Sequence, residues 1–322
     1  MHAVVIERTG GPEVMQLTSV ELGAPGPGVA LVRHRAIGVN FIDTYQRSGL
    51  YKLPLPAVLG SEAAGVVEAV GPGVSLAVGT RVAYASAGNG AYAEARLVSA
   101  DRLVLLPDDI DDETAAASLL KGMTVEYLVC RTRPVSAGET VLFHAAAGGV
   151  GLIACQWLRS IGAHVIGAVG SDEKAALARE HGAEHTIVTS RENIAERVRQ
   201  LTAGKGVPVV FDAVGKATLE ASLDSLAPRG MLVSFGNASG KPDPLDILTL
   251  SNKGSLYLTR PKLFDYVVTR DELVASSAAL FEKIRSGAVR VRIGERFSLE
   301  QVAEAHRALE SRRTTGSVVL VP

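Results

Sequence analysis

The sequence predicts an α/β protein of two domains, one built on a doubly wound parallel sheet and one rich in β-strands. Apolar runs alternate with helical segments through the middle of the chain, which is typical of a parallel sheet covered by helices on both faces. A turn of small residues separates the first of these runs from its helix. Short apolar runs broken by Gly and Pro fill the first 110 residues. We place the parallel sheet at 117–258 and the β-rich domain at 1–116 and 259–322, so that both chain ends form the second domain.

Five short apolar runs in the N-terminal region predict β-strands. Glycine and proline clusters at 10–12, 25–28 and 71–73 separate them, and such residues favour turns. Asp111-Asp-Glu113 then begins a helical stretch to about residue 131, which leads into the central domain. The five runs are Val4–Ile6, Val29–Arg33, Ala64–Val70, Arg81–Tyr84 and Ala91–Arg96.

The segment Ala145-Ala-Ala-Gly-Gly-Val-Gly151 is the most informative feature of the chain. It follows the apolar run Thr140–His144, a predicted buried strand, and leads into a helix at 152–161 that stops at Gly162. A strand, a small-residue turn and a helix form the first unit of a Rossmann-type domain. In that unit the pyrophosphate of a dinucleotide meets backbone N–H groups at the helix N-terminus.

Within this turn, Gly148 lets the backbone approach the phosphates and Gly151 lets the helix pack on the strand. Ala146 stands at the first glycine position of G-x-G-x-x-G, so an ordinary strand–helix connection is the alternative. The alternation that follows favours a dinucleotide. Its predicted segments are strands at 163–169, 186–188, 207–212, 230–236 and 253–258, and helices from Gly170-Ser-Asp-Glu-Lys174, at 191–202 and at 216–226. A helix at 269–286 and a final strand at 316–321, which we expect to return to the first domain, complete the chain.

Composition and charge exclude several classes of protein. The chain is 47% hydrophobic and 21% charged, with a net charge of −1, so nucleic-acid and membrane partners are not expected. Only two cysteines occur, Cys130 and Cys155, which excludes a disulfide framework and argues against a cysteine zinc site. The N-terminus lacks the features of a signal peptide, and no apolar stretch approaches the ~18 residues of a spanning helix. We expect a cytoplasmic protein.

The sequence resembles the zinc-free medium-chain dehydrogenase/reductase superfamily, within it the zeta-crystallin-like bacterial NADPH:quinone oxidoreductases. The resemblance implies a GroES-like catalytic domain beside the Rossmann-type domain. The motifs that carry it occur in family order over the whole chain: Gly38-Val-Asn-Phe-Ile-Asp-Thr-Tyr45, Ser48-Gly-Leu-Tyr51, Leu59-Gly-Ser-Glu-Ala-Ala-Gly65, Leu120-Lys-Gly-Met-Thr124, Phe143–Gly151, Val233-Ser-Phe-Gly-Asn237, Gly254–Pro261 and Leu309-Glu-Ser-Arg312.

Two further departures indicate that the resemblance is to the branch without zinc. Zinc-dependent members carry a cysteine ligand where this chain has Asn40-Phe-Ile-Asp43, and a histidine where Gly60-Ser-Glu62 has serine. Because a lone carboxylate does not bind zinc without histidine or thiolate ligands, we expect no metal.

The end of the second predicted strand of the parallel sheet favours NADPH over NADH. NAD-selective sites place Asp or Glu there, whereas this chain has Gly170 and Ser171, which leave room for a 2′-phosphate. Lys174 supplies a positive charge one turn later. An N-cap with an acidic first turn at 171–173 explains the same residues without a ligand, so NADH stays an alternative.

The resemblance adds Arg312 to the 2′-phosphate site and assigns Thr189 to a position where close relatives have tyrosine. It also implies a set of contacts along the rest of the cofactor. The pyrophosphate contacts are Gly148, Gly149 and Val150, and the nicotinamide contacts are Phe41, Ile42, Asp43, Thr44, Tyr45, Thr124, Tyr127, Val214, Phe235, Asn237, Gly240, Leu263 and Phe264.

Hydride transfer from NADPH needs few acid–base groups, because the cofactor supplies the reactive carbon. The protein must orient the acceptor and place donors near the developing oxyanion. Our candidates for these donors are Tyr45 and Tyr51, with Asn40 and Arg260 behind them. Packing with a solvated hydroxyl is the alternative for each tyrosine.

Three more polar residues have modest expected roles. Asp43 is expected to orient neighbours or cap a turn rather than to act as a base. His144 is expected to be a core histidine, and Lys121 either a phosphate ligand or a surface lysine.

The function predicted first is NADPH-dependent quinone reduction. Reduction of enals or enones is the second possibility, and a nucleotide- or RNA-binding or structural role without turnover is the third. The resemblance also implies a homodimer through the sheet edge at Gly254–Leu258, with an edge buried inside the monomer as the alternative.

Overall fold

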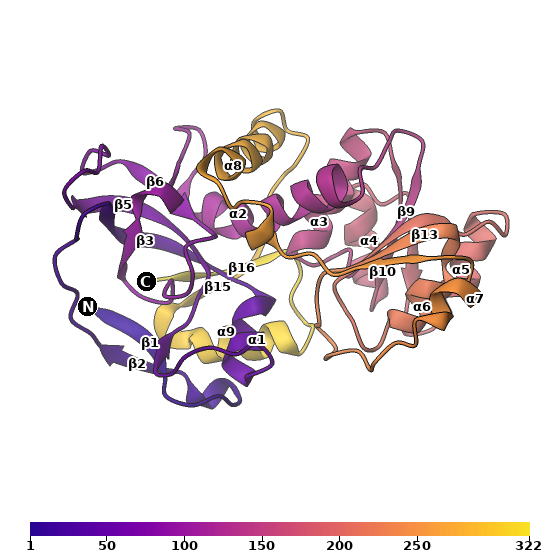
Figure 1. Cartoon of the computed structure of the whole chain (residues 1–322), viewed down its shortest axis with the longest axis horizontal. Coiled ribbons are helices and arrows are strands. Elements are labelled where there is room, and N and C mark those ends of the chain that lie inside the picture. Colours follow the sequence, from indigo (N-terminus) through magenta and orange to yellow (C-terminus); the bar gives the residue numbers. More distant parts are fainter. The chain divides into compact units, whose positions relative to one another are not determined.

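The computed structural model describes all 322 residues and divides into two compact units. The β-rich unit comprises Met1–Met123, Tyr266–Arg285 and Val291–Pro322, and the parallel-sheet unit comprises Thr124–Asp265 and Ser286–Arg290. The divisions after Met123 and Asp265 lie a few residues beyond the boundaries expected from the sequence. Figure 1 shows both units with many of their elements labelled.

Six parallel strands form the sheet of the parallel-sheet unit, in the order β11-β10-β9-β12-β13-β14. Numbered from β9, this is the 3-2-1-4-5-6 order of dinucleotide-binding domains, and the chain reverses its winding between β9 and β12. The doubly wound sheet is therefore confirmed. The strands are β9 (Thr140–His144), β10 (His164–Val169), β11 (His185–Val188), β12 (Val207–Asp212), β13 (Leu226–Ser234) and β14 (Tyr257–Thr259).

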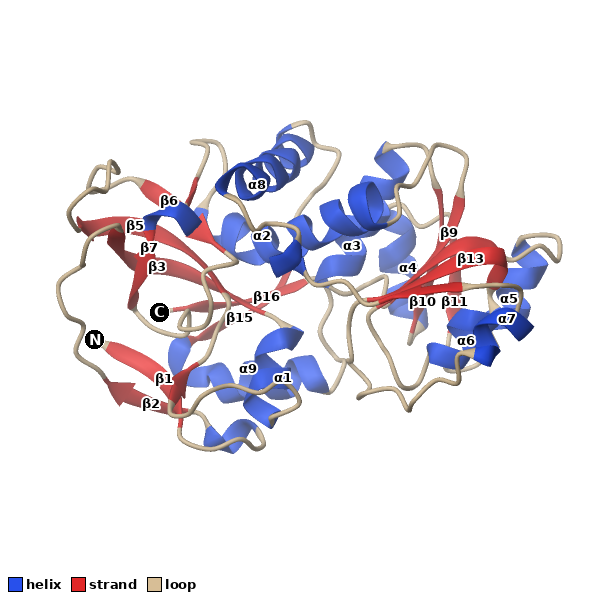
Figure 2. Ribbon diagram, in the orientation of Figure 1, coloured by secondary structure: helices blue, strands red, loops and turns tan.

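Helices cover both faces of this sheet (Figure 2). One buried cluster joins Leu142 and Ile166 of the strands to Val198 and Leu223 of two helices on one face. The remaining strand side chains, such as Phe143, point to the other face and are equally buried, which is why the strands are apolar throughout. The helices are α3 (Gly149–Ser160), α4 (Asp172–Glu180), α5 (Ile194–Leu201), α6 (Leu219–Asp224) and α7 (Leu248–Asn252).

The β-rich unit holds two sheets. A seven-stranded sheet has the order β15-β16-β3-β5-β6-β8 with β7 on β3, and a three-stranded sheet has the order β2-β1-β4. The C-terminal strand pairs with β3, where Val319 lies opposite Gly38, so the expected return of the chain is confirmed. The strands are β1 (His2–Ile6), β2 (Gln16–Ser19), β3 (Val29–Val39), β4 (Ala57–Val58), β5 (Glu62–Val70), β6 (Arg81–Tyr84), β7 (Ala95–Ser99), β8 (Val104–Leu105), β15 (Ile293–Ser298) and β16 (Ser317–Val321).

Four longer helices complete the chain, and none of its helices is long and apolar enough to cross a membrane. The sequence predicted neither the first of them, which begins beside Asn40 at the end of β3, nor the last, Val302–Glu310. The stretch expected to be helical to residue 131 is an α-helix only to Glu126 and continues as a π-helical segment, Tyr127–Thr132. These helices are α1 (Phe41–Ser48), α2 (Asp112–Glu126), α8 (Arg270–Arg285) and α9 (Val302–Glu310).

The bounds predicted for the strand at 253–258 were wrong. Gly254 and Ser255 have φ angles of 114° and 56°, so the chain turns there and β14 begins only at Tyr257. Residues in the left-handed region cannot continue a strand.

Candidate functional site

The N-terminus of α3 lies at the switch point of the parallel sheet and has no side-chain cap. Its N-cap is Gly148, and no acidic residue occurs in its first turn. Helices α4 and α5 differ, because Ser171 and Asn193 accept hydrogen bonds from their first turns. The first N–H groups of α3 have no intrahelical partner, so an anionic ligand would satisfy them.

Gly151 brings α3 against the strand that precedes it. A Cβ atom at this position would lie 2.3 Å from the Ala145 carbonyl oxygen and 2.6 Å from the Cα of Ala146. The expected close helix–strand packing is confirmed. Ala145 itself has φ 53°, a left-handed conformation that turns the chain sharply out of β9.

At the end of β12, the carboxylate of Asp212 organises the following loop. It is almost fully buried and accepts hydrogen bonds from the backbone N–H groups of Val214 and Gly215 at 2.7 and 3.1 Å. The hydroxyls of Thr218 and Ser222 donate to it at 2.7 and 2.8 Å. The loop that carries Val214 is therefore fixed by four donors to one carboxylate.

His144 belongs to the same buried cluster. Its Nε2 lies 3.0 Å from the Ser222 hydroxyl, whose hydrogen goes to Asp212, so Nε2 carries a proton and donates to Ser222. Burial lowers the pKa of His144. It is a core histidine, as expected. The sequence analysis missed this cluster, although the spacing of Asp212, Thr218 and Ser222, six and ten residues apart, is its visible signal.

Arg260 joins the end of β13 to the chain that follows β14. Its Nη1 donates to the Ser234 hydroxyl at 3.0 Å and to the Gly236 carbonyl at 2.8 Å. With the Asn237 amide oriented to satisfy both groups, Nη2 donates to the Asn237 oxygen at 3.0 Å. Arg260 thus fixes the segment that holds Phe235 and Asn237.

The end of β10 carries no acidic side chain. Gly170 is open, since a Cβ there would meet no atom within 4 Å. Ser171 caps α4 by accepting from the Lys174 backbone N–H at 3.4 Å. Thr189 is exposed, and its hydroxyl donates to the Val169 carbonyl at 3.1 Å.

Asp172, which lies beside this position, is engaged by Arg191. The two guanidinium nitrogens of Arg191 lie 2.6 and 2.7 Å from the two carboxylate oxygens. This bidentate pair lowers the pKa of Asp172. The negative charge that would oppose a 2′-phosphate is therefore partly compensated.

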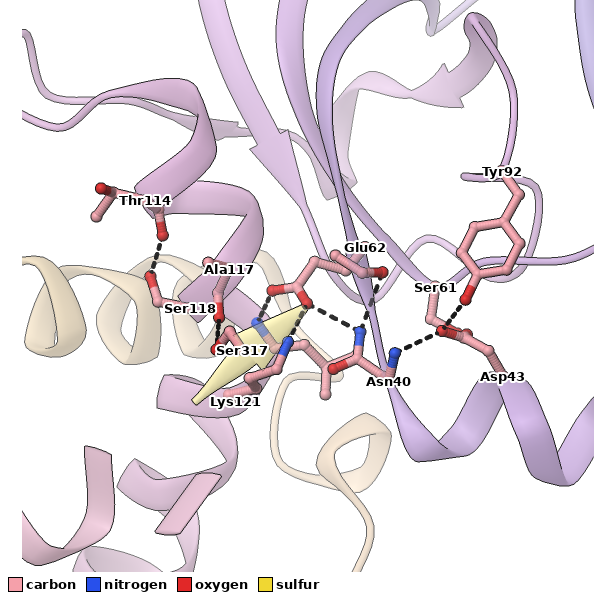
Figure 3. Close-up of polar contacts among 12 residues, drawn as sticks. Asn40, Asp43, Ser61, Glu62, Tyr92, Thr114, Ala117, Ser118, Lys121 and Ser317 are labelled. Atoms are coloured by element: carbon pink, nitrogen blue, oxygen red, sulfur yellow. Dashed lines mark hydrogen bonds and ion pairs between the residues drawn. The ribbon is translucent and has the colours of Figure 1, made fainter. Parts of the chain in front are cut away.

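In the β-rich unit, Asn40 and Asp43 form a capping box at the start of α1 (Figure 3). The Asn40 backbone N–H donates to Asp43 Oδ2 at 2.9 Å. The Ser61 hydroxyl donates to Oδ1 at 2.8 Å and the Tyr92 hydroxyl to Oδ2 at 2.9 Å. Burial raises the pKa of Asp43 to about 6, against the effect of these donors.

The Asp43 side chain is fully buried, so it orients neighbours and caps α1, as the sequence indicated. The contact of Asp43 with a cofactor that the resemblance implied stays a prediction, and with this burial it would involve the backbone of Asp43. Thr44 is also buried, and its hydroxyl donates to the Phe41 carbonyl at 2.8 Å. Any contact from Thr44 would therefore come through its backbone.

Glu62 connects Asn40 to α2 (Figure 3). Its Oε2 accepts from Asn40 Nδ2 at 2.9 Å and from Lys121 Nζ at 3.3 Å, while the Leu120 backbone N–H donates to Oε1. Both expectations for Lys121 were wrong, because this lysine is only 5% exposed and is paired with a buried carboxylate. A lysine with a glutamate partner 59 positions away gives no local sequence signal.

Three aromatic rings follow Asn40. The ring centroids of Tyr45 and Tyr51 lie 5.2 Å apart in an edge-to-face arrangement, and those of Phe41 and Tyr45 lie 6.1 Å apart. The Tyr51 backbone N–H donates to the Tyr45 carbonyl at 3.0 Å. The structure thus groups both proposed donor tyrosines at the second half of α1 and the turn that follows it.

The other predicted residues divide between the two units. Thr124 and Tyr127 are buried around the end of α2, and Leu263 and Phe264 lie in a short 3-10 helix, Leu263–Asp265. Ile42 is half-buried in α1, and Arg312 follows α9 with φ 57°. The parallel-sheet unit holds Thr124, Tyr127, Gly148, Gly149, Val150, Gly170, Ser171, Lys174, Thr189, Val214, Phe235, Asn237, Gly240, Arg260, Leu263 and Phe264. The β-rich unit holds Asn40, Phe41, Ile42, Asp43, Thr44, Tyr45, Tyr51 and Arg312.

The residues at the positions of zinc ligands do not suit zinc. The oxygens of Asp43 already accept from three donors, and Ser61 donates to one of them. No group of three or more His, Cys, Asp or Glu side chains in the chain could hold a metal ion.

The strand order, the uncapped α3 N-terminus and the second, β-rich unit define a medium-chain dehydrogenase/reductase without the zinc ligands. Comparison with protein-family models agrees. Residues 26–108 match the alcohol dehydrogenase GroES-like domain, and residues 149–274 match the zinc-binding dehydrogenase family. The name of the second family reflects other members, since this chain lacks their ligands.

Full-length relatives narrow the assignment. The chain is 56% identical to a quinone oxidoreductase of Pseudomonas aeruginosa over 97% of each protein. A crystal structure of Escherichia coli quinone oxidoreductase complexed with NADPH superimposes with a TM-score of 0.98 at 47% identity and covers 100% of each chain. A 2-haloacrylate reductase of a Burkholderia species is 46% identical over 99% of this chain and 98% of the relative. The chain belongs to the quinone oxidoreductase family.

Proposed function

We propose that the protein reduces quinones by hydride transfer from NADPH, without zinc. The observation that carries the proposal is the uncapped α3 N-terminus at the switch point of the sheet, in a chain that matches quinone oxidoreductases over its full length. Together they support a diphosphate ligand and a nicotinamide reductant.

The residues fit NADPH better than NADH. The end of β10 lacks the acidic residue that would bind two ribose hydroxyls, and the open space at Gly170 suits a 2′-phosphate. Lys174, with Ser171 and with Arg312 of the β-rich unit, would supply donors and positive charge to it.

When bound, NADPH supplies a hydride from its nicotinamide ring. Tyr45 and Tyr51 would donate hydrogen bonds to the oxygen of the acceptor, where negative charge develops. Asn40, bonded to Glu62, would hold the start of α1 in place. Arg260 would fix the Phe235–Asn237 segment, which lies beyond the carboxyl end of β13.

The second candidate is reduction of a carbon–carbon double bond conjugated to a carbonyl or carboxyl group. The 46% identity to a 2-haloacrylate reductase favours it, because that acceptor is a conjugated acid. Hydride addition and oxyanion stabilisation are the same in both reactions.

The test is an NADPH-oxidation assay with 1,4-benzoquinone, a 2-enal, 2-chloroacrylate or no acceptor. We expect the fastest turnover with the quinone, and at least tenfold lower kcat/KM with NADH in place of NADPH. Faster turnover with the enal or the acrylate would establish the second candidate. NADPH binding without turnover of any acceptor would instead indicate a binding or structural role.

We also propose a homodimer formed through β14, in which two edge strands meet. No strand of this chain pairs with the outer edge of β14, and Tyr257 and Leu258 are 57% and 41% exposed. Ile247 and Leu248, at the start of α7, add further exposed apolar surface. We propose the cytoplasm as the location, where both cysteines, Cys130 and Cys155, would be free thiols.

A further inference from the structure

We propose that Tyr92 and His306 are positioning residues for hydride transfer: with Arg47 they form a one-directional chain of hydrogen bonds that holds the Asp43 carboxylate and, through it, the start of α1. The inference rests on the proposed function, because α1 and Asn40 are placed at the nicotinamide only by that proposal. All of the hydrogen bonds that link these residues lie within the β-rich unit.

The chain of hydrogen bonds closes a ring on one face of α1. The Tyr92 hydroxyl lies 2.9 Å from Asp43 Oδ2 and 3.0 Å from His306 Nε2. His306 Nδ1 lies 3.1 Å from Nη1 of Arg47. Asp43 and Arg47 are four residues apart on α1, so they share a face of the helix. Tyr92, from the loop before β7, and His306, from α9, bridge them.

Every member of this ring is buried. Asp43, Tyr92 and His306 have no exposed surface, and Arg47 is 2% exposed. The Arg47 guanidinium is held at its outer side by Glu310, whose oxygens lie 2.6 and 3.1 Å away. Its Nε donates to the Gly10 carbonyl at 3.1 Å. These contacts fix the position of the Arg47 guanidinium independently of His306.

The direction of every hydrogen bond in the ring follows from Arg47. A guanidinium only donates, so His306 Nδ1 accepts and the imidazole is neutral with its proton on Nε2. Nε2 then donates to the Tyr92 oxygen, and the Tyr92 hydroxyl donates to Asp43. Burial and the Arg47 charge lower the pKa of His306 to about 3, which agrees with a neutral imidazole.

This arrangement orients but does not conduct protons. A relay would require Arg47 to release a proton to His306, and a guanidinium does not do so in proteins. Asp43 instead accepts from three donors: the Tyr92 hydroxyl, which belongs to the ring, and the Ser61 hydroxyl and the Asn40 backbone N–H, which lie outside it. A carboxylate accepts all three, whereas a protonated carboxyl must itself donate and would displace one of them.

The groups around Asp43 and its burial shift the pKa of its carboxyl in opposite directions. Lys121 and the donors Ser61, Asn40 and Tyr92 favour the carboxylate, while burial opposes it and sets the pKa at about 6. Glu62 raises the pKa of Tyr92, and Arg47 lowers it. Loss of the Tyr92 donor therefore raises the pKa of Asp43, and α1 loses its ordered start at a higher pH.

The experiment compares Tyr92→Phe, His306→Leu and His306→Gln with the wild type. Gln can accept from Arg47 and donate to Tyr92, so it preserves the direction of the chain, whereas Leu cannot. Tyr84→Phe is the matched control: Tyr84 is equally buried in the same unit and its hydroxyl also lies against a histidine, His34 Nε2 at 2.8 Å, outside the ring. The readouts are kcat/KM with NADPH and 1,4-benzoquinone, and NADPH affinity by fluorescence, each from pH 5.5 to 8.5.

We expect Tyr92→Phe to raise the acid-limb pKa by about one unit, which lowers kcat/KM about five- to tenfold at pH 5.5 and less than twofold at pH 8. His306→Leu should give about half of that shift, His306→Gln should stay within about twofold of wild type, and Tyr84→Phe should leave the profile unchanged. The pH dependence of NADPH affinity should shift in the same order.

A wild-type pH profile in Tyr92→Phe, or an equal shift in Tyr84→Phe, would overturn the inference. So would equal effects of His306→Gln and His306→Leu, which would indicate packing alone. A wild-type protein that binds NADPH but reduces no acceptor would refute the proposed function, and the affinity profiles would still decide the role of the ring.

Discussion

At the residue scale, the chemistry of the parallel-sheet unit depends on the absence of a side chain at Gly151. The Cβ of any other residue would lie 2.3 Å from the Ala145 carbonyl oxygen. Gly151→Ala should lower the free energy of unfolding by about 1–3 kcal/mol and weaken NADPH binding, because α3 must move away from β9. Thermal unfolding and fluorescence titration measure both effects. Gly23→Ala, in an exposed loop with no atom within 4 Å of the new Cβ, is the control and should change neither.

A single charge carries much of the expected cofactor preference. Lys174→Gln should weaken NADPH binding about tenfold and leave NADH binding unchanged, because only NADPH has a 2′-phosphate for the lysine to pair with. Titrations with both nucleotides measure the ratio. The matched control is Lys205→Gln, in the turn before β12, at the amino ends of the parallel strands. Equal losses for NADPH and NADH would contradict this role of Lys174.

At the element scale, a buried carboxylate fixes the loop between β12 and α6. Asp212→Asn puts an amide NH2 among four donors, so at least one donor is left without an acceptor. We expect a loss of about 2 kcal/mol in unfolding free energy and weaker NADPH binding through displacement of Val214. Denaturant titration measures the first and fluorescence the second. Asp243→Asn, an exposed carboxyl paired with Lys216, should have no effect on either.

The helices show which elements a linear pattern can predict. In the parallel-sheet unit, strands and helices alternate and each kind has its own hydrophobic pattern. The sequence therefore predicted them in order. Helix α1 was missed because its start depends on a cap rather than on a periodic face: Asn40 and Asp43 bond each other only where β3 ends. The early turn at Gly254 shortened β14 for the same kind of local reason.

At the scale of the whole molecule, buried histidines make the fold sensitive to acid. Burial lowers the pKa of His34 to about 4 and of His306 to about 3, below their value of 6.5 in the unfolded chain. The stability they contribute is present above pH 6.5 and is lost as the pH falls toward these folded-state values. Asp43, raised from 3.8 to about 6, has the opposite sign and gains stability over the range from 6 down to 3.8.

Between pH 7.5 and pH 5, the stability lost through the two histidines exceeds the stability gained through Asp43. We expect the unfolding free energy to be about 2–3 kcal/mol lower at pH 5 than at pH 7.5. Denaturant titrations at both pH values measure the difference. The double variant His34→Gln, His306→Gln should remove most of the difference, because the lowered pKa of the buried His144 and the raised pKa of Asp43 then remain and have opposite effects. A difference that persists in this variant would assign the acid sensitivity to other groups.

The oligomeric state is also a property of the whole molecule. The chain has a mass of 33.7 kDa, and we expect about twice that by sedimentation equilibrium. Leu258→Lys should give a monomer, because it places a charge on the apolar edge of β14. Val78→Lys, at a residue 64% exposed in the β-rich unit, should remain a dimer. A wild-type monomer would refute the edge-strand interface.

The sequence by itself determined the parallel sheet, the glycine turn before α3, the missing zinc ligands and the acid-free end of β10. Each of these is a local pattern, because hydrophobic periodicity, turn residues and motif spacing act over a few neighbouring positions. The tertiary structure alone decided the partners of the buried polar groups. Tyr92 and His306 are 214 positions apart, and Lys121 lies 59 positions from Glu62. A buried polar group must find a partner wherever the fold brings one, and chain folding, not spacing, sets that choice.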